Sequence, residues 1–275
     1  MKYLFFDLDG TLLNSEKIIT NNTKNYLYLI KKQGYILGVA SGRSINGVED
    51  ALYYSDANNL FDVIISSGGA DIHDLKENRH YKRNYISPNM LKLILDDLKE
   101  KPELTIVFHN SPYLYASKHI PRIDKIVAMN RYKGFINPYE NEAYFEAPKL
   151  LVLLPNKNRD ELKEYLRNKK YPKLIGYLAE DEIYEFVDEN NLKSIAISDY
   201  VNIYGDSLED VMCFGDSEND IDMLEAAKVG VCMKNGEKLS KQVADYITNK
   251  SNDEDGIIHF LQRYFEEVKE CQEKK

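Results

Sequence analysis

Short apolar segments that alternate with helical segments limit the folds open to this chain more than any other feature. Several apolar runs of five or six residues are followed by polar residues, and helical stretches separate them. Buried strands separated by helices are typical of a parallel sheet that is covered on both faces. The strands expected on this basis are residues 2–6, 35–40, 62–66, 211–216 and 229–233, and the helices are residues 21–33, 44–54, 193–204 and 220–227.

The pattern changes near residue 83. From there, strand-like segments follow one another closely, which favours antiparallel pairing. These strands are expected at 104–110, 113–117, 149–154, 173–179 and 183–187, with helices over 88–99 and near 158–168. The parallel pattern resumes after this region. We therefore predict an α/β protein with a Rossmann-like parallel-sheet core, residues 1–82 and 186–275, and an inserted α+β domain over 83–185.

Composition excludes several classes of function. The 275 residues include 36 basic and 45 acidic side chains, a net charge of -9. This charge disfavours nucleic-acid binding, which depends on clustered Lys and Arg, but it allows a small anionic substrate. No apolar run approaches a membrane span, and the N-terminal apolar stretch is too short for a signal sequence. We expect a cytoplasmic protein without nucleic-acid or membrane partners, as a monomer or weak homodimer.

Cysteine and histidine give no sign of a metal site. Three cysteines are too few and too scattered for a disulfide framework or a zinc ribbon. The five histidines show no ligand spacing, so we expect them to be surface or core residues. They are His73, His80, His109, His119 and His259.

Three predicted strands end in polar residues of related chemistry. The first ends in Asp7-Leu8-Asp9-Gly10-Thr11, the second in Ser41-Gly42-Arg43, and a late strand in Gly215-Asp216-Ser217-Glu218-Asn219-Asp220. Ligands of open parallel sheets bind at the carboxyl ends of strands. Taken alone, the first motif is common in capped turns, the second in ordinary loops and the third at acidic helix N-caps, but capping does not explain all three together. They supply carboxylates for a hard divalent cation beside donors for an anion.

These motifs resemble those of haloacid dehalogenase superfamily hydrolases, in the Cof-like group with a large inserted cap. The resemblance rests on FFDLDGTLLN (5–14), ASGRS (40–44), CFGDSENDIDML (213–224) and Lys193. It covers residues 1–80 and 185–265, and between them extends only to the architecture of the cap. Two departures stand out: Ser194 replaces the usual Gly after the lysine, and Gly68-Gly69 replaces Asn-Gly, which removes a polar contact to substrate.

The resemblance implies phosphoryl transfer through an aspartyl-phosphate. Asp7 would attack phosphorus, and Asp9 would protonate the leaving alcohol and later activate water. Mg²⁺ would be held by Asp7, the backbone carbonyl of Asp9 and Asp216, with Asp220 acting indirectly or through water. The transferring phosphoryl group would be gripped by Ser41, the Gly42 N–H, Lys193 and Asn219. Arg43 would either contact substrate or brace its loop.

The implied function is a Mg²⁺-dependent phosphatase for small phosphorylated metabolites, such as sugar phosphates or phosphorylated cofactors. Asp9 favours hydrolysis, since family transporters carry Thr at that position. Two alternatives remain: a phosphomutase with the same intermediate, and a signalling or binding protein that is phosphorylated on Asp7 without turnover. The inserted domain is expected to act as a lid that excludes water and selects the leaving group. The sequence does not name the substrate.

Overall fold

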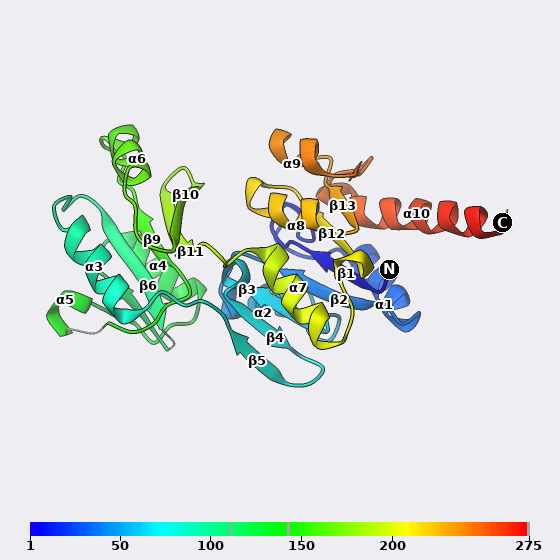
Figure 1. Cartoon of the computed structure of the whole chain (residues 1–275), viewed down its shortest axis with the longest axis horizontal. Helices are drawn as coiled ribbons and strands as arrows, with labels where there is room; N and C mark the ends of the chain where they lie inside the picture. Colours follow the sequence, from blue (N-terminus) through cyan, green and yellow to red (C-terminus); the bar gives the residue numbers. More distant parts are fainter. Residues whose placement is uncertain (111, 142–143, 274–275) are drawn as a thin grey trace. The chain divides into compact units, whose positions relative to one another are not determined.

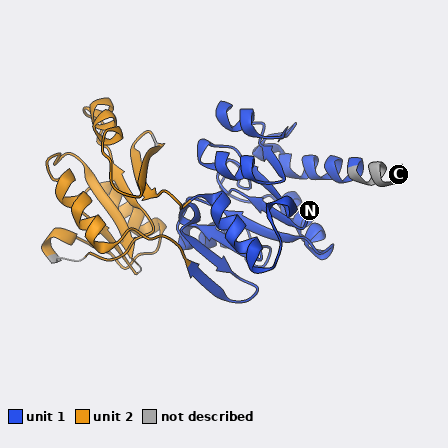
Figure 2. Ribbon diagram, in the orientation of Figure 1, with its two compact units in different colours: residues 1–81, 192–275 blue, residues 82–191 orange. Residues whose placement is uncertain are grey.

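The computed structural model describes residues 1–110, 112–141 and 144–273. The chain forms two compact units: Met1–Tyr81 with Leu192–Lys275, and Lys82–Asn191 (Figure 2). The predicted insertion, 83–185, would end inside strand β11 (Ile183–Asp188). Strand β11 continues to pair with β10 (Leu174–Glu180) as far as Asp188, so the second unit extends beyond the predicted end.

Unit 1 is built on an eight-stranded sheet in the order β14-β13-β12-β1-β2-β3-β4-β5 (Figure 1). Pairing is parallel from β14 to β3, and β4 pairs antiparallel with β3. The α/β class is confirmed. Strands β4 and β5, the last two in this order, were not predicted because their charged residues lack an apolar pattern. The bounds are β1 (Tyr3–Phe6), β2 (Ile36–Ala40), β3 (Val63–Ser66), β4 (Asp71–Asp74), β5 (Arg79–Lys82), β12 (Val211–Gly215), β13 (Val229–Cys232) and β14 (Tyr246–Ile247).

Helices cover both faces of this sheet. In β1, Leu4 and Phe6 pack with α1 (Asn21–Lys32), α2 (Ile45–Tyr54) and α10 (Gly256–Glu273) in a first core cluster. Tyr3 and Phe5 point to the opposite face and pack with α7 (Lys193–Ile203) and α8 (Ile221–Ala226) in a second cluster. A further short helix is α9 (Lys238–Val243). Within the described ranges, no helix is long and apolar enough to cross a membrane.

Unit 2 has its own six-stranded sheet, in the order β10-β11-β9-β6-β7-β8. Its pairs are antiparallel except β7 with β8. Helices α3 and α6 contribute to one apolar cluster and α4 to another, which is the predicted α+β arrangement. Elements α4, β8 and α5 lie between residues 118 and 148, where we predicted no helix or strand. The remaining bounds are α3 (Pro88–Leu98), β6 (Thr105–Asn110), β7 (Tyr113–Ala116), α4 (Pro121–Met129), β8 (Phe135–Ile136), α5 (Pro138–Asn141), β9 (Leu150–Leu153) and α6 (Arg159–Arg167).

Candidate active site

The order of the strands brings the three polar motifs together at the carboxyl ends of the parallel strands of the unit 1 sheet. Strand β1 lies between β12 and β2, and all three run in the same direction. The Asp7 N–H donates to the Phe214 carbonyl at 2.9 Å, so the nucleophile candidate lies directly beside the end of β12. Because the carboxyl ends of parallel strands meet at the same edge, the polar residues after β12, β1 and β2 become neighbours.

A buried lysine connects two of these motifs. Lys193, the first residue of α7, places its Nζ 2.7 Å from Asp7 Oδ1 and 2.6 Å from Asp220 Oδ1. The exposed fractions of the Lys193, Asp7 and Asp220 side chains are 2%, 7% and 0%. Charges so deeply buried are stable only when they are paired and hydrogen-bonded. The ion triad Asp7–Lys193–Asp220 therefore holds β1, the turn after β12 and α7 together.

Both oxygens of Asp220 are committed to the scaffold. Oδ1 accepts from Lys193, while Oδ2 accepts from the N–H groups of Asp216 (2.9 Å) and Ser217 (3.0 Å). The bond from the Ser217 N–H is one half of a capping box on the 3₁₀ turn Glu218–Asp220; in the other half the Ser217 side chain accepts from the Asp220 N–H. Asp220 can therefore fix the shape of the loop after β12, and its expected indirect role at a metal is compatible with this geometry.

Three carboxylates form a compact acidic cluster. One oxygen from each of Asp7, Asp216 and Asp220 lies within 4.8 Å of the other two. The Thr11 hydroxyl donates to Asp216 Oδ1 at 2.8 Å and fixes that side chain. Three ionised carboxylates beside one lysine ammonium leave two negative charges. This oxygen-rich cluster is suited to a divalent cation.

Burial makes the ionised forms of Asp7 and Asp216 unfavourable. It raises the pKa of Asp7; Lys193 opposes the rise and Asp220 adds to it. Burial also raises the pKa of Asp216 to about 6, against the hydrogen bond from Thr11. For Lys193, burial favours the neutral amine, but Asp220 and Asp7 outweigh it and raise the pKa. The acidic cluster thus has the Lys193 ammonium as a permanent cation on one side, and a second cation, such as a metal ion, would stabilise its ionised carboxylates.

Gly10 is needed next to the acidic cluster. Its φ is +82°, and a Cβ at this position would lie 2.3 Å from Asp216 Oδ2. Its carbonyl accepts from Asn235 Nδ2 at 2.7 Å. Glycine therefore permits both the left-handed turn and the close approach of the β1 loop to Asp216.

Asp9 lies with two cations. Arg43 Nε is 2.7 Å from Asp9 Oδ2, and Nη2 is 2.7 Å from Oδ1. Lys17 Nζ is 2.8 Å from Oδ1. Burial opposes ionisation of Asp9, but the bonds from Arg43 and Lys17 outweigh it and lower the pKa. Arg43 also donates to the Gly47 carbonyl at 3.2 Å, so the structure makes it a partner of Asp9 and a brace of its loop.

Three of the four predicted phosphate-binding residues, Ser41, Gly42 and Asn219, lie on the loops that follow β2 and β12, and the fourth, Lys193, begins α7. Ser41 is buried, and its Oγ accepts from the Arg43 N–H at 3.2 Å. A Cβ on Gly42 would lie 3.9 Å from Asn219 Nδ2, so the two loops approach each other there. The Asn219 Oδ1 accepts from the Ser217 hydroxyl at 2.7 Å. Their binding of phosphate stays a prediction.

Sequence reasoning gave no role to several residues that support the site. Lys17 pairs with Asp9 and Asn235 holds Gly10, as described above. Asp222 Oδ2 accepts from the Ser194 N–H at 2.7 Å, at the start of α7. A Cβ on Gly69, at φ +106°, would lie 2.5 Å from the Leu192 carbonyl oxygen. Asp222 and Gly69 lie in segments that the sequence analysis singled out, CFGDSENDIDML (213–224) and Gly68-Gly69, but neither was given a role. Lys17 and Asn235 lie outside the motifs quoted above.

A comparison with protein families agrees with this geometry. The family model of haloacid dehalogenase-like hydrolases matches residues 4–261. The chain belongs to this family. It is 25% identical to the 5-amino-6-(5-phospho-D-ribitylamino)uracil phosphatase YitU of Bacillus subtilis, over 94% of this chain and 96% of that protein. It is 27% identical to YwtE of B. subtilis, a phosphatase of the same name, over 95% and 97%.

Solved structures support the same assignment. A haloacid dehalogenase-like hydrolase from Bacteroides thetaiotaomicron is 25% identical and has a TM-score of 0.83, over 96% of this chain and 99% of that one. The subclass IIB sugar phosphatase BT4131, 24% identical with a TM-score of 0.80 over 96% and 99%, shares the fold. The expected family resemblance is confirmed. The prediction of a phosphoric monoester hydrolase is confirmed as well, since the phosphatases YitU and YwtE align with this chain over nearly their whole length.

We expect Lys193→Met to destabilise the protein strongly. Removing the ammonium leaves Asp7 and Asp220 buried without their cation, which costs about 3–5 kcal/mol in comparable pairs. The deficit in the free energy of unfolding should be larger at pH 8 than at pH 5, because protonation relieves the unpaired carboxylates. Urea unfolding without divalent cations measures it.

Lys17→Met is the matched control. The Lys17 side chain is 63% exposed and pairs with Asp9, which is 40% exposed. An exposed pair contributes only ~0–1 kcal/mol. Equal stability of the two variants would mean that the ion triad does not hold the site together.

Proposed function

We propose that this protein is a Mg²⁺-dependent phosphatase that hydrolyses small phosphorylated metabolites through a phosphorylated Asp7. The observation that carries this proposal is the acidic cluster, in which Asp7, Asp216 and Asp220 lie within 4.8 Å of one another beside Lys193. A carboxylate nucleophile, a cation site and a fixed ammonium are the groups that transfer of a phosphate dianion to a carboxylate requires.

Asp7 and Asp216 are the side chains that would hold the metal, together with the backbone carbonyl of Asp9. Carboxylate and carbonyl oxygens suit Mg²⁺, and the two surplus negative charges of the cluster match its charge. When bound, Mg²⁺ would offset the negative charge of the phosphoryl oxygens. Asp220 would act on the metal only through the loop that it holds.

Asp7 supplies the covalent chemistry. One of its carboxylate oxygens attacks phosphorus while the bond from phosphorus to the leaving alkoxide breaks. Water then attacks the phosphorus of the phospho-aspartate, which releases inorganic phosphate and restores Asp7. Lys193 favours the ionised carboxylate throughout, because its ammonium is bonded to Asp7 Oδ1. Ser41, the Gly42 N–H, Lys193 and Asn219 are the donors proposed to orient the phosphoryl oxygens.

Asp9 exchanges the protons in both steps. It gives a proton to the leaving alkoxide in the first step and takes one from water in the second. Arg43 and Lys17 lower the pKa of Asp9, which suits its role as the base that takes a proton from water and opposes its role as the acid that protonates the alkoxide. We infer that the ion pair between Arg43 and Asp9 weakens when substrate binds, so that Asp9 can carry a proton.

The relatives indicate the class of substrate. YitU and YwtE are phosphatases of 5-amino-6-(5-phospho-D-ribitylamino)uracil, a phosphate ester of a sugar-alcohol chain. BT4131 is a sugar phosphatase. Primary phosphate esters of polyhydroxylated metabolites are therefore the first compounds to assay.

Asp7→Asn tests the proposed mechanism. The neutral amide cannot attack phosphorus and anchors a cation poorly, so phosphate release with Mg²⁺ should fall to background. The assay follows inorganic phosphate from a panel of sugar phosphates and the ribitylaminouracil phosphate. Phosphate release by the wild type in the presence of chelator, or by a folded Asp7→Asn variant, would contradict the proposal. A stable phosphoprotein that releases no phosphate would favour a non-turnover role.

Asp9→Asn tests the proton transfers. Turnover should fall by roughly 10²–10⁴, the usual effect of lost acid–base catalysis. A phosphate ester with a good leaving group needs less protonation, so its burst of alcohol release should be reduced less.

Arg43→Gln is the companion variant. Loss of the guanidinium raises the Asp9 pKa, so the acid limb of the plot of kcat against pH should move to higher pH in this variant. Equal losses for both leaving groups, with an unmoved acid limb, would remove Asp9 from this role.

Unit 2 is proposed to select the leaving group. The site residues all lie in unit 1 and account for metal and phosphate, whereas Lys82–Asn191 has its own sheet and apolar core. Replacing this unit by a Gly/Ser linker should flatten the differences in kcat/KM among natural esters, while cleavage of a small activated ester persists. The truncated protein must first give a dispersed NMR spectrum. An unchanged rank order of esters would assign specificity to unit 1.

A further inference from the structure

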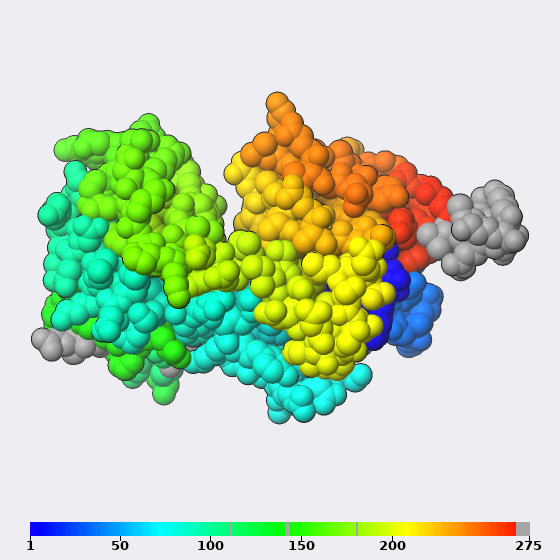
Figure 3. All heavy atoms as spheres, viewed as in Figure 1, coloured from blue at the N-terminus to red at the C-terminus, as the bar shows by residue number. Residues whose placement is uncertain are grey.

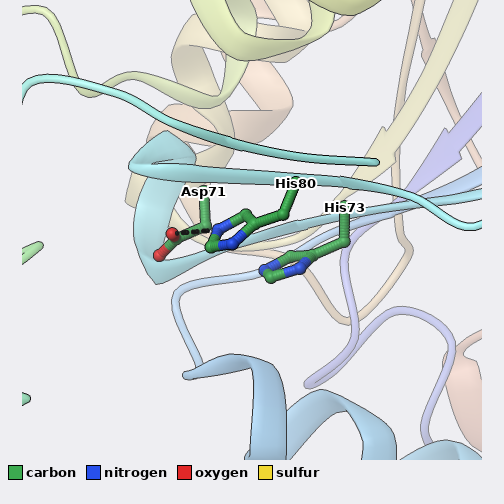
Figure 4. Close-up of side chains that lie close together, drawn as sticks. All are labelled: Asp71, His73 and His80. Atoms are coloured by element: carbon green, nitrogen blue, oxygen red, sulfur yellow. Dashed lines mark hydrogen bonds and ion pairs between the residues drawn. The ribbon is translucent and has the colours of Figure 1, made fainter. Parts of the chain in front are cut away.

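The hairpin at the edge of the unit 1 sheet carries a second group of ligating side chains. Asp71 and His73 lie two residues apart on β4 and therefore point to the same face. His80 lies on the neighbouring strand β5. Figure 4 shows the three side chains together. We expected the histidines to have no ligand role, because their positions in the sequence show no ligand spacing.

The three side chains form a contiguous cluster. The His80 Nε2 lies 2.7 Å from Asp71 Oδ1. The rings of His73 and His80 are stacked, with centroids 4.2 Å apart and an interplanar angle of 13°. One ligand atom from each of the three residues lies within 4.8 Å of the other two. Two imidazoles and a carboxylate are thus held together by the pairing of two strands.

The cluster is separate from the candidate active site. His73 is opposite Ile64 in the register of β3 and β4, and Ile64 belongs to the first core cluster. Ile72 belongs to the second cluster, on the α7 face. The side chains of Asp71 and His73 therefore lie on the face opposite α7, and two strands separate β4 from β1.

A metal ion would have access to this position. Strand β5 is the last in the sheet order, and the hairpin lies at the surface of unit 1 (Figure 3). The exposed fraction of the His80 side chain is 42%, whereas that of Asp71 is 9%. A metal could thus enter past His80, while Asp71 provides a fixed anchor.

We propose that Asp71, His73 and His80 form a binding site for a divalent transition metal of the Zn²⁺ type. Imidazole nitrogen together with carboxylate oxygen is a common zinc donor set, whereas Mg²⁺ prefers oxygen ligands alone. Three protein ligands leave the fourth tetrahedral position for water. The bound ion would cross-link β4 to β5 and so stabilise the edge of the sheet immediately before the chain enters unit 2.

The distances between the ligand atoms require only small shifts, but one imidazole ring must also rotate. A metal lies in the plane of each imidazole that binds it, whereas the rings of His73 and His80 are stacked at 13° from parallel, so the exposed His80 ring would turn out of the stack. Ligand atoms about 2.0–2.1 Å from a tetrahedral zinc stand about 3.3 Å from one another. The ion would take the place of the proton shared by His80 and Asp71, and the pair would open by about half an ångström from its 2.7 Å contact. His73 would exchange its 3.3 Å contact with the Ser66 hydroxyl for the metal, or keep it through its second nitrogen.

The test uses the full-length protein after chelation, with excess Mg²⁺ to saturate the acidic cluster. Zn²⁺ is titrated by calorimetry, and Co²⁺ is used as a probe whose visible absorption reports tetrahedral imidazole ligation. We expect one Zn²⁺ per chain in addition to Mg²⁺, a visible Co²⁺ band, and a higher Tm with Zn²⁺.

His80→Gln removes a ligand from an exposed position and should leave phosphatase activity with Mg²⁺ unchanged. It should weaken Zn²⁺ binding by at least about tenfold, since even the loss of a partner behind a ligand costs 10–100-fold. It should also abolish the Co²⁺ band and the Tm shift, and Asp71→Asn should reproduce both losses.

His119→Gln is the matched control. His119 is 52% exposed and its Nε2 lies 3.0 Å from Asp124, and no third ligating side chain joins this pair within the described part of the chain. This variant should bind Zn²⁺ like the wild type. Equal Zn²⁺ affinity in wild type and His80→Gln, or no Zn²⁺ binding in the wild type, would overturn the proposal.

Discussion

The pairing of Lys193 with Asp7 and Asp220 is the interaction on which the candidate site depends. Asp7 lies 186 residues before Lys193, and Asp220 lies 27 residues after it. The three buried charges are tolerated because the lysine ammonium pairs with both carboxylates. Each of the three segments that carry them can therefore occupy its position only when the other two are in place. The two halves of unit 1, which Lys82–Asn191 separates in the sequence, are thereby joined at the site itself.

The sheet prepares this interaction. Because β1 lies between β12 and β2, the residues that follow these strands meet without long loops. Alternating side chains of β1 pack on both faces, which leaves the strand no freedom to shift by one residue. A single glycine, Gly10, lets the β1 loop reach Asp216. The precision of the acidic cluster therefore derives from a rigid central sheet.

Charge in the site is divided between two carboxylates with different surroundings. Asp7 is buried beside one ammonium and two other carboxylates, and its pKa is raised. Asp9 is partly exposed and gripped by Arg43 and Lys17, and its pKa is lowered. Two aspartates separated by one residue are thus suited to different tasks, a separation that is common where a nucleophile and an acid–base group act together.

The order of residues was enough to predict the fold class, the interrupted parallel core and the three motif loops, because apolar periodicity and strand-end chemistry are local properties. It was also enough to predict the family, since each of the motifs DLDGT, SGR and GDSEND is an unbroken run of residues. Three sets of contacts became visible only in the folded chain: Lys193 with Asp7 and Asp220, Arg43 and Lys17 with Asp9, and the stacked His73 and His80 beside Asp71. These contacts depend on strand order and on the register of an edge hairpin whose polar residues carry no pattern. Strand order is set by packing the whole core, so no local stretch of sequence contains it.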